Sequence, residues 1–526
     1  MSRYSGLFKA ARNAGAIGLA MLTIACSGAT TGYTPAPNDP NHWWPTAAPT
    51  SAPWGPTAAP WDAPTAAPYP APVDFDNPGV NPFNDPNIDR YSTFAMDVDT
   101  ASYAIARRFL EDGNMPERDS VRVEEFVNAF NYGYQPPSDS AFAIHLDGGH
   151  TPFINANSIL LRVGIKAQEV AANQRKPVSL TFIIDTSGSM EMEGRLELVK
   201  AALGLLVTRL RADDSVAIVN FSDNAGVILN PTSAAEPAAI LNAINSLQTG
   251  GSTNAQAGLE LGYDLATLGH RAGANDRVVL ASDGVANVGL TNADQMLQRV
   301  DHEVSLGIDL VTIGVGMGDF NDTLLEQLAN RGNGFYAYVN DRVEAEKLFG
   351  EGLVGTLETV ARDAKVQVEF RPEAVSRYRL LGYENRAIAD QDFRDPTVDA
   401  GEVGAGHAVT ALYEIEPAWS SDGFLGTVRL RWLDPATGLE QSEVQDIDLN
   451  QLGGEFFVSG PSFRLAAIVA AFAEILRDSP YAIGFTLADV AREAEAIVGS
   501  FPGHPDVAML RDLTNTAARL DRGGGW

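Results

Sequence analysis

The spacing of apolar and polar residues changes along the chain and divides it into blocks. From 178 to 360, short apolar runs such as "LTFIID", "SVAIVNF" and "GIDLVTIGVG" alternate with segments whose apolar residues recur at helical spacing. Apolar strands that alternate with helices are typical of a mostly parallel sheet covered on both faces. We therefore predict an α/β domain over 178–360, in which the first helix begins at Arg195 and the last runs from Val343 to Val360.

The regions on either side of this block alternate apolar and polar residues with the period of a strand. Ala141 to Leu146 and Ile159 to Ile165 do so in the region 89–177, and "KVQVEF", "RYRLLGYENR" and "FLGTVRLRWL" do so in the region 361–455. Neither set alone covers both faces of its sheet, so we expect the two to pack as one β-rich domain that holds the α/β domain as an insertion. The region 456–526 is predicted to be helical. Within it, "FRLAAIVAAFAEILR" is apolar on nearly all sides, which predicts a buried helix, and the charged residues that interrupt it argue against a membrane span.

The first 88 residues have no pattern typical of a folded domain. Residues 1–26 carry basic positions, then an apolar run too short to span a bilayer, and end at Cys26. This order resembles the bacterial lipoprotein signal, in which the cysteine is lipidated and becomes the mature N-terminus, although Thr23 stands where Leu is usual. Residues 27–88 are rich in Pro, Ala and Thr, which indicates an extended tether.

These features predict an exported protein of the cell envelope that is held at a membrane by lipid. In a cell that has an outer membrane, that membrane is favoured, because Ser27 follows the cysteine in place of the Asp that often signals inner-membrane retention. An ordinary secretory signal with a chance cysteine is the alternative.

The charge balance narrows the classes of partner. The chain has 37 basic and 67 acidic residues, a formal net charge of −30. This balance argues against nucleic-acid binding, which needs a basic face to neutralise phosphate. The single cysteine excludes an internal disulfide and a cysteine-based zinc site.

Oxygen-bearing side chains follow the predicted strands at three places. "LTFIID" ends at Asp185 and continues through Ser187 and Ser189, Thr253 follows a glycine pair in a loop that opens a helix, and Asp283 ends another apolar strand. Loops at the carboxyl ends of parallel strands meet at one edge of the sheet. Because ligands that are all oxygen suit a hard cation, we predict a site for Mg²⁺ or Mn²⁺ that can accept a further anionic ligand.

The same five residues match the metal-ion-dependent adhesion site (MIDAS) of the von Willebrand factor type A (VWA) domain, whose pattern is D-x-S-x-S, then Thr, then Asp. The resemblance implies a Rossmann-like α/β fold in which Ser187, Ser189 and Thr253 coordinate the metal directly, while the aspartates act largely through water. Ser282 stands where the family often has Thr. Stretches such as "STFAMDVDTASYAIARRFL" and "VGAGHAVTALYEI" further resemble bacterial exported lipoproteins that carry this domain between family-specific flanking regions.

The resemblance implies a binding module without enzymatic activity, whose metal captures the carboxylate of an Asp or Glu on a protein partner. Two alternatives are a Mg²⁺-dependent phosphatase-like hydrolase and a structural envelope protein whose metal only stabilises the fold. A phosphatase of the haloacid dehalogenase type would use Asp97 and Asp99, but Ala101 stands where its motif needs Thr. We expect these two aspartates to cap the following helix, and His407 to be a packed residue.

Overall fold

The computed structural model describes residues 79–522, apart from 97–98, 172, 285–289, 317–321, 347, 350–357, 396–397, 399 and 419–422. The predicted lipidation site at Cys26 and most of the predicted tether lie outside the described residues. Within the described residues, no helix is both long enough and apolar enough to cross a bilayer.

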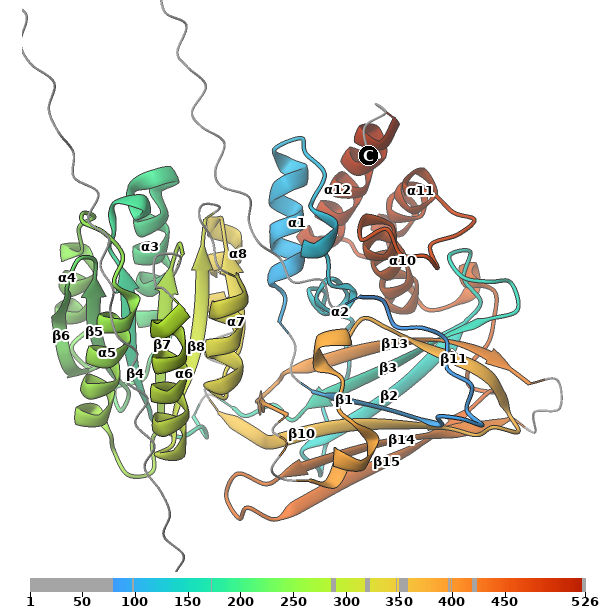
Figure 1. Ribbon diagram of the computed structural model, residues 1–526, viewed down its shortest axis with the longest axis horizontal. Coiled ribbons are helices and arrows are strands. Elements are labelled where there is room, and N and C mark those ends of the chain that lie inside the picture. The colour runs from blue at the N-terminus through green and yellow to red at the C-terminus, as the bar shows by residue number, and fades with distance from the viewer. Residues whose placement is uncertain are drawn as a thin grey trace, which may run out of the picture. The chain divides into compact units, whose positions relative to one another are not determined.

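The α/β domain is built on one sheet with the strand order β6-β5-β4-β7-β8-β9 (Figure 1). All neighbouring pairs are parallel except β5 and β6. The mostly parallel sheet predicted from the apolar runs is therefore confirmed. Its strands are β4 (Val178–Asp185), β5 (Ser215–Phe221), β6 (Ala225–Ser233), β7 (Asn275–Ser282), β8 (Ile308–Val315) and β9 (Tyr336–Val339).

Helices cover both faces of this sheet, which is why every residue of β4 is buried. Phe182 and Ile184 point to the face covered by α3 (Arg195–Val207) and α4 (Pro237–Ser246). Ile183 points to the other face, where side chains of α5, α6 and α7 form a second core. These helices are α5 (Ala255–Gly269), α6 (Leu290–Ser305) and α7 (Asp322–Arg331). Helix α1 (Ala101–Glu111) contributes Ala104 and Ile105 to this second core.

The flanking strands form two antiparallel sheets around one shared core, as predicted. One sheet has the order β11-β13-β3-β2, and the other has the order β1-β10-β14-β15 with β12 beside β10. Strands β3 and β13 come from opposite sides of the α/β domain in sequence and pair from Ile159↔Ile415 to Lys166↔Ala408. The strands are β1 (Tyr91–Ala95), β2 (Phe142–Gly149), β3 (Ile159–Ala167), β10 (Thr359–Phe370), β11 (Val375–Leu381), β12 (Glu402–Gly404), β13 (Ala408–Pro417), β14 (Phe424–Leu433) and β15 (Glu440–Asp448).

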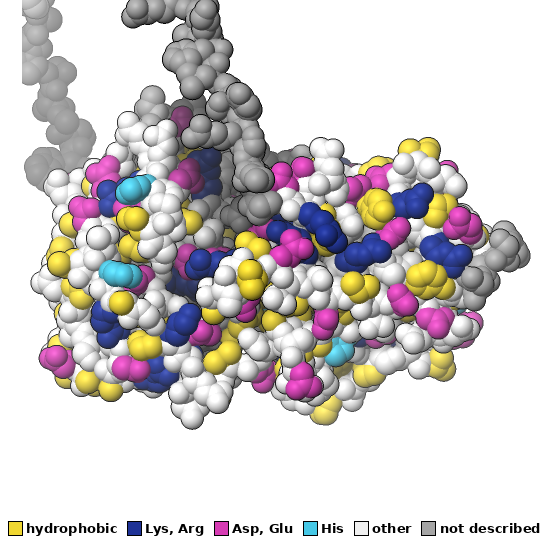
Figure 2. Space-filling model, turned by 90° about the horizontal axis from the view of Figure 1, so that it is seen from below, with side chains coloured by type: hydrophobic (Ala, Val, Ile, Leu, Met, Phe, Trp, Pro, Cys, Tyr) yellow, Lys and Arg dark blue, Asp and Glu magenta, His cyan; other side chains and the backbone are white. Residues whose placement is uncertain are grey.

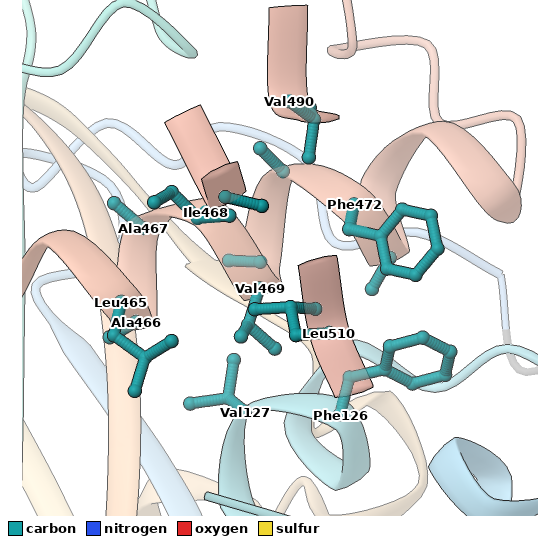
Figure 3. Close-up of a cluster of buried hydrophobic side chains, with 14 of the residues drawn as sticks. Phe126, Val127, Leu465, Ala466, Ala467, Ile468, Val469, Phe472, Val490 and Leu510 are labelled. Carbon is teal, nitrogen blue, oxygen red and sulfur yellow. The ribbon is translucent and has the colours of Figure 1, made fainter. Parts of the chain in front are cut away.

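The C-terminal helices pack around a third core, shown in Figure 3. Helix α10 (Pro461–Leu476) is buried on nearly all sides, as predicted, and contacts α11 (Leu487–Ile497) and α2 (Val123–Asn128). Phe472 of α10 lies edge-on to Phe126 of α2 at 6.2 Å between ring centroids. Helix α12 (Pro505–Arg522) closes the cluster with Leu510.

Two local predictions are wrong. Helix α8 (Arg342–Glu346) does not continue to Val360, because Thr359 and Val360 already belong to β10, where Thr359 pairs with Gly404 of β12. Asp99 does not cap α1: its Oδ1 accepts a hydrogen bond of 2.8 Å from the Tyr336 backbone N–H, and its other oxygen pairs with Arg386. The buried Asp99 therefore ties the start of α1 to β9. Asp97 lies outside the described residues.

Candidate metal site

Strand β4 delivers the first part of the candidate site at its carboxyl end. Asp185 is its last residue, and the chain then turns into the short 3₁₀ segment η2 (Gly188–Gly194). The Ser187 backbone N–H donates to Asp185 Oδ1 at 2.8 Å, which fixes the turn. The hydroxyl oxygens of Ser187 and Ser189 lie 3.0 Å apart. The turn therefore gathers one carboxylate and two hydroxyls in five residues.

Strand β7 lies next to β4 in the sheet and supplies the second part. Ser282 is its last residue, and Asp283 follows. The Ser282 hydroxyl donates to Asp185 Oδ2 at 2.6 Å, and the Ser189 hydroxyl donates to Asp283 Oδ1 at 2.9 Å. Four of the five predicted residues, Asp185, Ser187, Ser189 and Asp283, are thus joined by hydrogen bonds, with Ser282 as a link.

Thr253 lies on a neighbouring loop and is partly buried. The Gly188 N–H donates to Gly251 O at 3.0 Å, and the Gly250 N–H donates to Thr186 O at 2.8 Å, so this loop is bound to the turn after β4. Among the described residues, no hydrogen bond joins the Thr253 side chain to the other four. The loop is positioned by Asp223, whose Oδ1 accepts from the Ser252 backbone N–H at 2.9 Å and from its hydroxyl at 2.6 Å.

Asp185 is buried with 0% exposure, and this burial dominates its electrostatics. Burial raises the pKa of Asp185 to about 6, and the charge of Asp283 adds to the rise, against the lowering effect of hydrogen bonds from Ser282 and Ser187. No basic side chain among the described residues pairs with Asp185. A carboxylate buried without a cation is costly, and a bound metal ion would remove that cost.

Asp283 differs, because it has a basic partner that the sequence pattern did not reveal. Arg195, the first residue of α3, donates to Asp283 Oδ2 at 2.7 Å, and both side chains are buried. Arg195 stands six residues after Ser189 at the start of a helix, where the sequence gives it no distinguishing signal. Ser282 was also missed as a contact of Asp185, although its place before Asp283 could have pointed to it.

The donor set fits a hard cation. The described residues contain no group of three His, Cys, Asp or Glu side chains that could hold a metal, and this site offers two carboxylates and hydroxyls instead. Carboxylate and hydroxyl oxygens suit Mg²⁺, which is usually held by one or two carboxylates and retains several waters. Hydroxyl ligands add no negative charge, so a divalent ion held here would keep part of its charge for another anion.

The other candidate residues do not form a second chemical site among the described residues. Asp99 is committed to Arg386 and the Tyr336 backbone, so it is not free to act as a nucleophile. His407, which we expected to be a packed residue, is half-buried just before β13, and burial together with the charge of Lys166 lowers the pKa of its imidazole to about 4.

Comparison with known protein families identifies three regions of the chain. Residues 179–351 match the von Willebrand factor type A domain, and residues 355–425 match the family described as "Uncharacterized protein YfbK, C-terminal". Residues 71–162 match a family described as "von Willebrand factor".

Several individual proteins are similar over much of this chain. The YfbK protein of Escherichia coli (strain K12) is 35% identical over 433 residues, which cover 78% of this chain and 75% of that protein. The sll0103 protein of Synechocystis sp. is 28% identical over 294 residues, 53% of this chain and 67% of that protein. Human inter-alpha-trypsin inhibitor heavy chain H3 is 24% identical over 260 residues, 46% of this chain and 28% of that protein.

Solved structures also resemble this chain. A von Willebrand factor type A protein from Catenulispora acidiphila is 16% identical, with a TM-score of 0.41, and the match covers 74% of this chain and 89% of that one. Proximal thread matrix protein 1 from the mussel byssus, solved with a zinc-occupied MIDAS motif, is 22% identical with a TM-score of 0.29, over 37% and 47% of the two chains.

Proposed function

The chain belongs to the YfbK family and contains a von Willebrand factor type A domain, and from this premise we propose that it is a metal-dependent protein-binding module of the cell envelope. Such domains commonly mediate metal-dependent protein interactions and are mostly not enzymes. The proposed ion is Mg²⁺ or Mn²⁺. The residues that would hold it are Asp185, Ser187, Ser189, Thr253 and Asp283. When bound, the ion would supply a positive charge that attracts an acidic group of a partner.

One observation carries this proposal: Asp185 is fully buried, lies beside two hydroxyls, and has no basic partner among the described residues. A side chain that served only the fold would be expected to have a compensating cation. The carboxylate is instead held by donors on both oxygens, at 2.8 Å and 2.6 Å. Both donors are neutral, so the negative charge of Asp185 is left without a balancing cation, as a cation site requires.

Thermal unfolding with and without Mg²⁺ tests the metal. An ion that binds only the folded state stabilises it by mass action, so the melting temperature of the wild-type protein should rise with Mg²⁺ concentration. Asp185→Ala should remove that response and still fold. Asp213→Ala is a matched control in the same domain, because Asp213 is exposed and pairs with Arg211 away from the site. An unchanged response of Asp185→Ala would reject the site.

We infer that the partner presents an Asp or Glu carboxylate. The chain carries a net charge of −30 and repels acidic partners at long range, so the attraction must act at short range, through the metal. On the face shown in Figure 2, basic side chains are interspersed among acidic ones. Nucleic acid, which needs a continuous basic face, is not among the proposed partners.

Capture from envelope extract identifies the partner. Immobilised wild-type protein should retain it in Mg²⁺ and release it in EDTA, and immobilised Asp185→Ala should not retain it. Replacing the partner's key Asp or Glu by the amide should weaken binding similarly. Retention in EDTA would place binding on another surface, while a metal-dependent melting temperature without any partner would favour a structural role for the ion.

We also propose that Cys26 carries lipid and holds the protein at a membrane, which is the outer membrane in a cell that has one. The support is the order of basic, apolar and small residues before Cys26. Firm anchoring needs more than one acyl chain, since a single chain binds a bilayer only marginally. Wild-type protein should incorporate labelled fatty acid and Cys26→Ser should not. Equal labelling of both would disprove the anchor.

A further inference from the structure

Arg195 lies where a cation is costly unless something compensates it. It is the first residue of α3, and its exposed fraction is 3%. The N-terminal end of a helix carries a partial positive charge, so a cation there is repelled. Burial of the guanidinium adds a desolvation cost. Its bond of 2.7 Å to Asp283 Oδ2 offsets these costs, so the pair has been built into the site.

The end of strand β8 is shaped to admit this side chain. Gly316 follows the strand directly and has a φ of +74°, a backbone conformation that residues with a side chain rarely adopt. A Cβ at Gly316 would lie 2.3 Å from Arg195 Nε and 2.7 Å from its Cδ. The absence of a side chain at Gly316 therefore leaves the path by which the guanidinium reaches the site.

The pair changes the charge of the site. Asp283 divides its oxygens, with Oδ1 accepting from Ser189 and Oδ2 accepting from Arg195. Two carboxylates and one guanidinium leave one net negative charge, carried in effect by Asp185. A divalent ion would bring the site to one net positive charge, whereas without Arg195 the loaded site would be neutral.

We propose that Arg195 is an internal cation of the metal site that weakens binding of the metal alone and leaves the loaded site with a net positive charge for an acidic group. This inference rests on the proposed function and deepens it. Arg195 is a positioning residue, since it acts on the metal and the acidic group through Asp283 and through its charge. Metal and acidic group should therefore bind cooperatively.

Calorimetric titration with Mg²⁺ tests the first half. Arg195→Gln should bind Mg²⁺ at least about 10-fold more tightly than wild type, because the like charge paired with the proposed ligand Asp283 is removed. Arg195→Met keeps the apolar stem beside Gly316 and should behave similarly. Arg195→Lys keeps the charge and should stay within about 3-fold of wild type. A neutral variant that folds only when Mg²⁺ is present would support the inference, since the ion then replaces the missing cation.

Arg175→Gln is the matched control. Arg175 is also buried and pairs with a buried aspartate, Asp214, but at the amino end of β4 and β5. The Arg175→Gln substitution removes the same unit of charge as Arg195→Gln and should leave the Mg²⁺ affinity unchanged. Equal affinity in wild type, Arg195→Gln and Arg195→Met would overturn the inference while leaving the metal site intact. Absence of Mg²⁺ binding in all of these proteins would overturn the proposed function with it.

Acetate, as a carboxylate probe, tests the second half. Acetate should tighten Mg²⁺ binding to the wild type and to Arg175→Gln, and should do so less for Arg195→Gln, because only the former keep the extra positive charge. An equal acetate effect in all three would overturn the role of Arg195 toward the acidic group.

Discussion

Two aspartates at opposite ends of the same pair of strands have the same burial and opposite surroundings. Asp185 ends β4, Asp214 precedes β5, and each has 0% exposure. Asp214 accepts two hydrogen bonds from Arg175, at 2.9 and 2.5 Å, and two more from the backbone N–H groups of Val178 and Arg211. Among the residues that the structure describes, Asp185 accepts hydrogen bonds only from the neutral donors Ser282 and Ser187.

The pKa values follow from these surroundings. Burial by itself would raise the pKa of Asp214, but the hydrogen bonds from Arg175 and the backbone hold that pKa below its usual value. Burial raises the pKa of Asp185 to about 6. The comparison teaches that the aspartate at the amino end of the sheet, Asp214, has its charge balanced by Arg175 and serves the fold, whereas the charge of Asp185 at the carboxyl end is not balanced by a paired cation. That imbalance supports the proposal that a cation binds at the carboxyl end.

Breaking the buried ion pair between Arg175 and Asp214 should have the largest effect on stability. Asp214→Asn leaves the buried Arg175 without its carboxylate, so the free energy of unfolding should fall by about 3–5 kcal/mol. Denaturant unfolding measures this change. The increase of melting temperature with Mg²⁺ should survive in this variant, and its loss would mean that the two ends are coupled.

The equivalent change at the carboxyl end of the sheet, Asp185→Asn, should stabilise the metal-free protein. Asp185 has a pKa of 3.8 in the unfolded chain and about 6 in the folded one. Between these values the folded state binds more protons, so the free energy of unfolding falls as pH rises from about 4 to 6 and stays lowered at pH 7. Asp185→Asn lacks this loss, so in EDTA at pH 7 it should be more stable than wild type by about 1–3 kcal/mol.

Denaturant unfolding in EDTA across pH 4 to 7 checks this prediction. The advantage of Asp185→Asn should shrink as the pH falls below about 6 and disappear near pH 4. Mg²⁺ should raise the stability of the wild type alone. A variant less stable than wild type at pH 7 would show that the carboxylate stabilises the metal-free fold and that the comparison with Asp214 fails.

Ser282→Ala should have a moderate effect on the metal. Its hydroxyl donates to Asp185 Oδ2 at 2.6 Å, and a hydrogen bond to a charged group contributes about 1.5–3 kcal/mol. We expect Mg²⁺ affinity to fall by about 10-fold, because Asp185 loses both its orientation and a donor. Ser282→Thr keeps the hydroxyl and serves as the control. Equal Mg²⁺ affinity in wild type and Ser282→Ala would contradict the assigned role.

Asp223→Ala should have the smallest effect. Asp223 is on the surface and holds the loop of Thr253 through two hydrogen bonds to Ser252. Its loss should weaken Mg²⁺ binding by about 3-fold, because the loop becomes less ordered without losing a proposed ligand. Asp223→Asn retains an acceptor oxygen and should recover part of the affinity in the same titration.

Much of this architecture could be predicted because its signals are local. Strands β4, β7 and β8 are buried on both faces and appear in the sequence as continuous apolar runs, which fixed the type of sheet and the edge at which Asp185 and Asp283 meet. The end of the helix predicted to close the α/β domain, 343–360, could not be predicted. Thr359 lies in β10 because β10 pairs with β12 and β14, and this pairing forms only in the folded chain.

The ion pairs of the buried aspartates could not be predicted from the sequence. The pairs Arg195–Asp283 and Asp99–Arg386 join residues far apart in sequence. A short-range pattern assigns such residues to a helix start or a cap, because helix N-termini favour Asp and tolerate many residues at the first turn. The pattern of hydroxyls and carboxylates was local to three loops, which is why the candidate ligands were found and Arg195 was not.

The pairing of β3 with β13 also has a consequence for how the chain is made. Lys166 and Ala408 are register partners, and they lie 242 positions apart in the sequence (408 minus 166). At the usual speed of ribosomal synthesis, about 5–20 residues per second, β13 emerges roughly 10–50 seconds after β3. During that interval the whole inserted domain is synthesised, and any hairpin that β2 and β3 form lacks the strand that pairs with the second edge of β3. The edge that later joins the two halves of the β-rich domain is thus exposed to wrong pairing until β13 arrives.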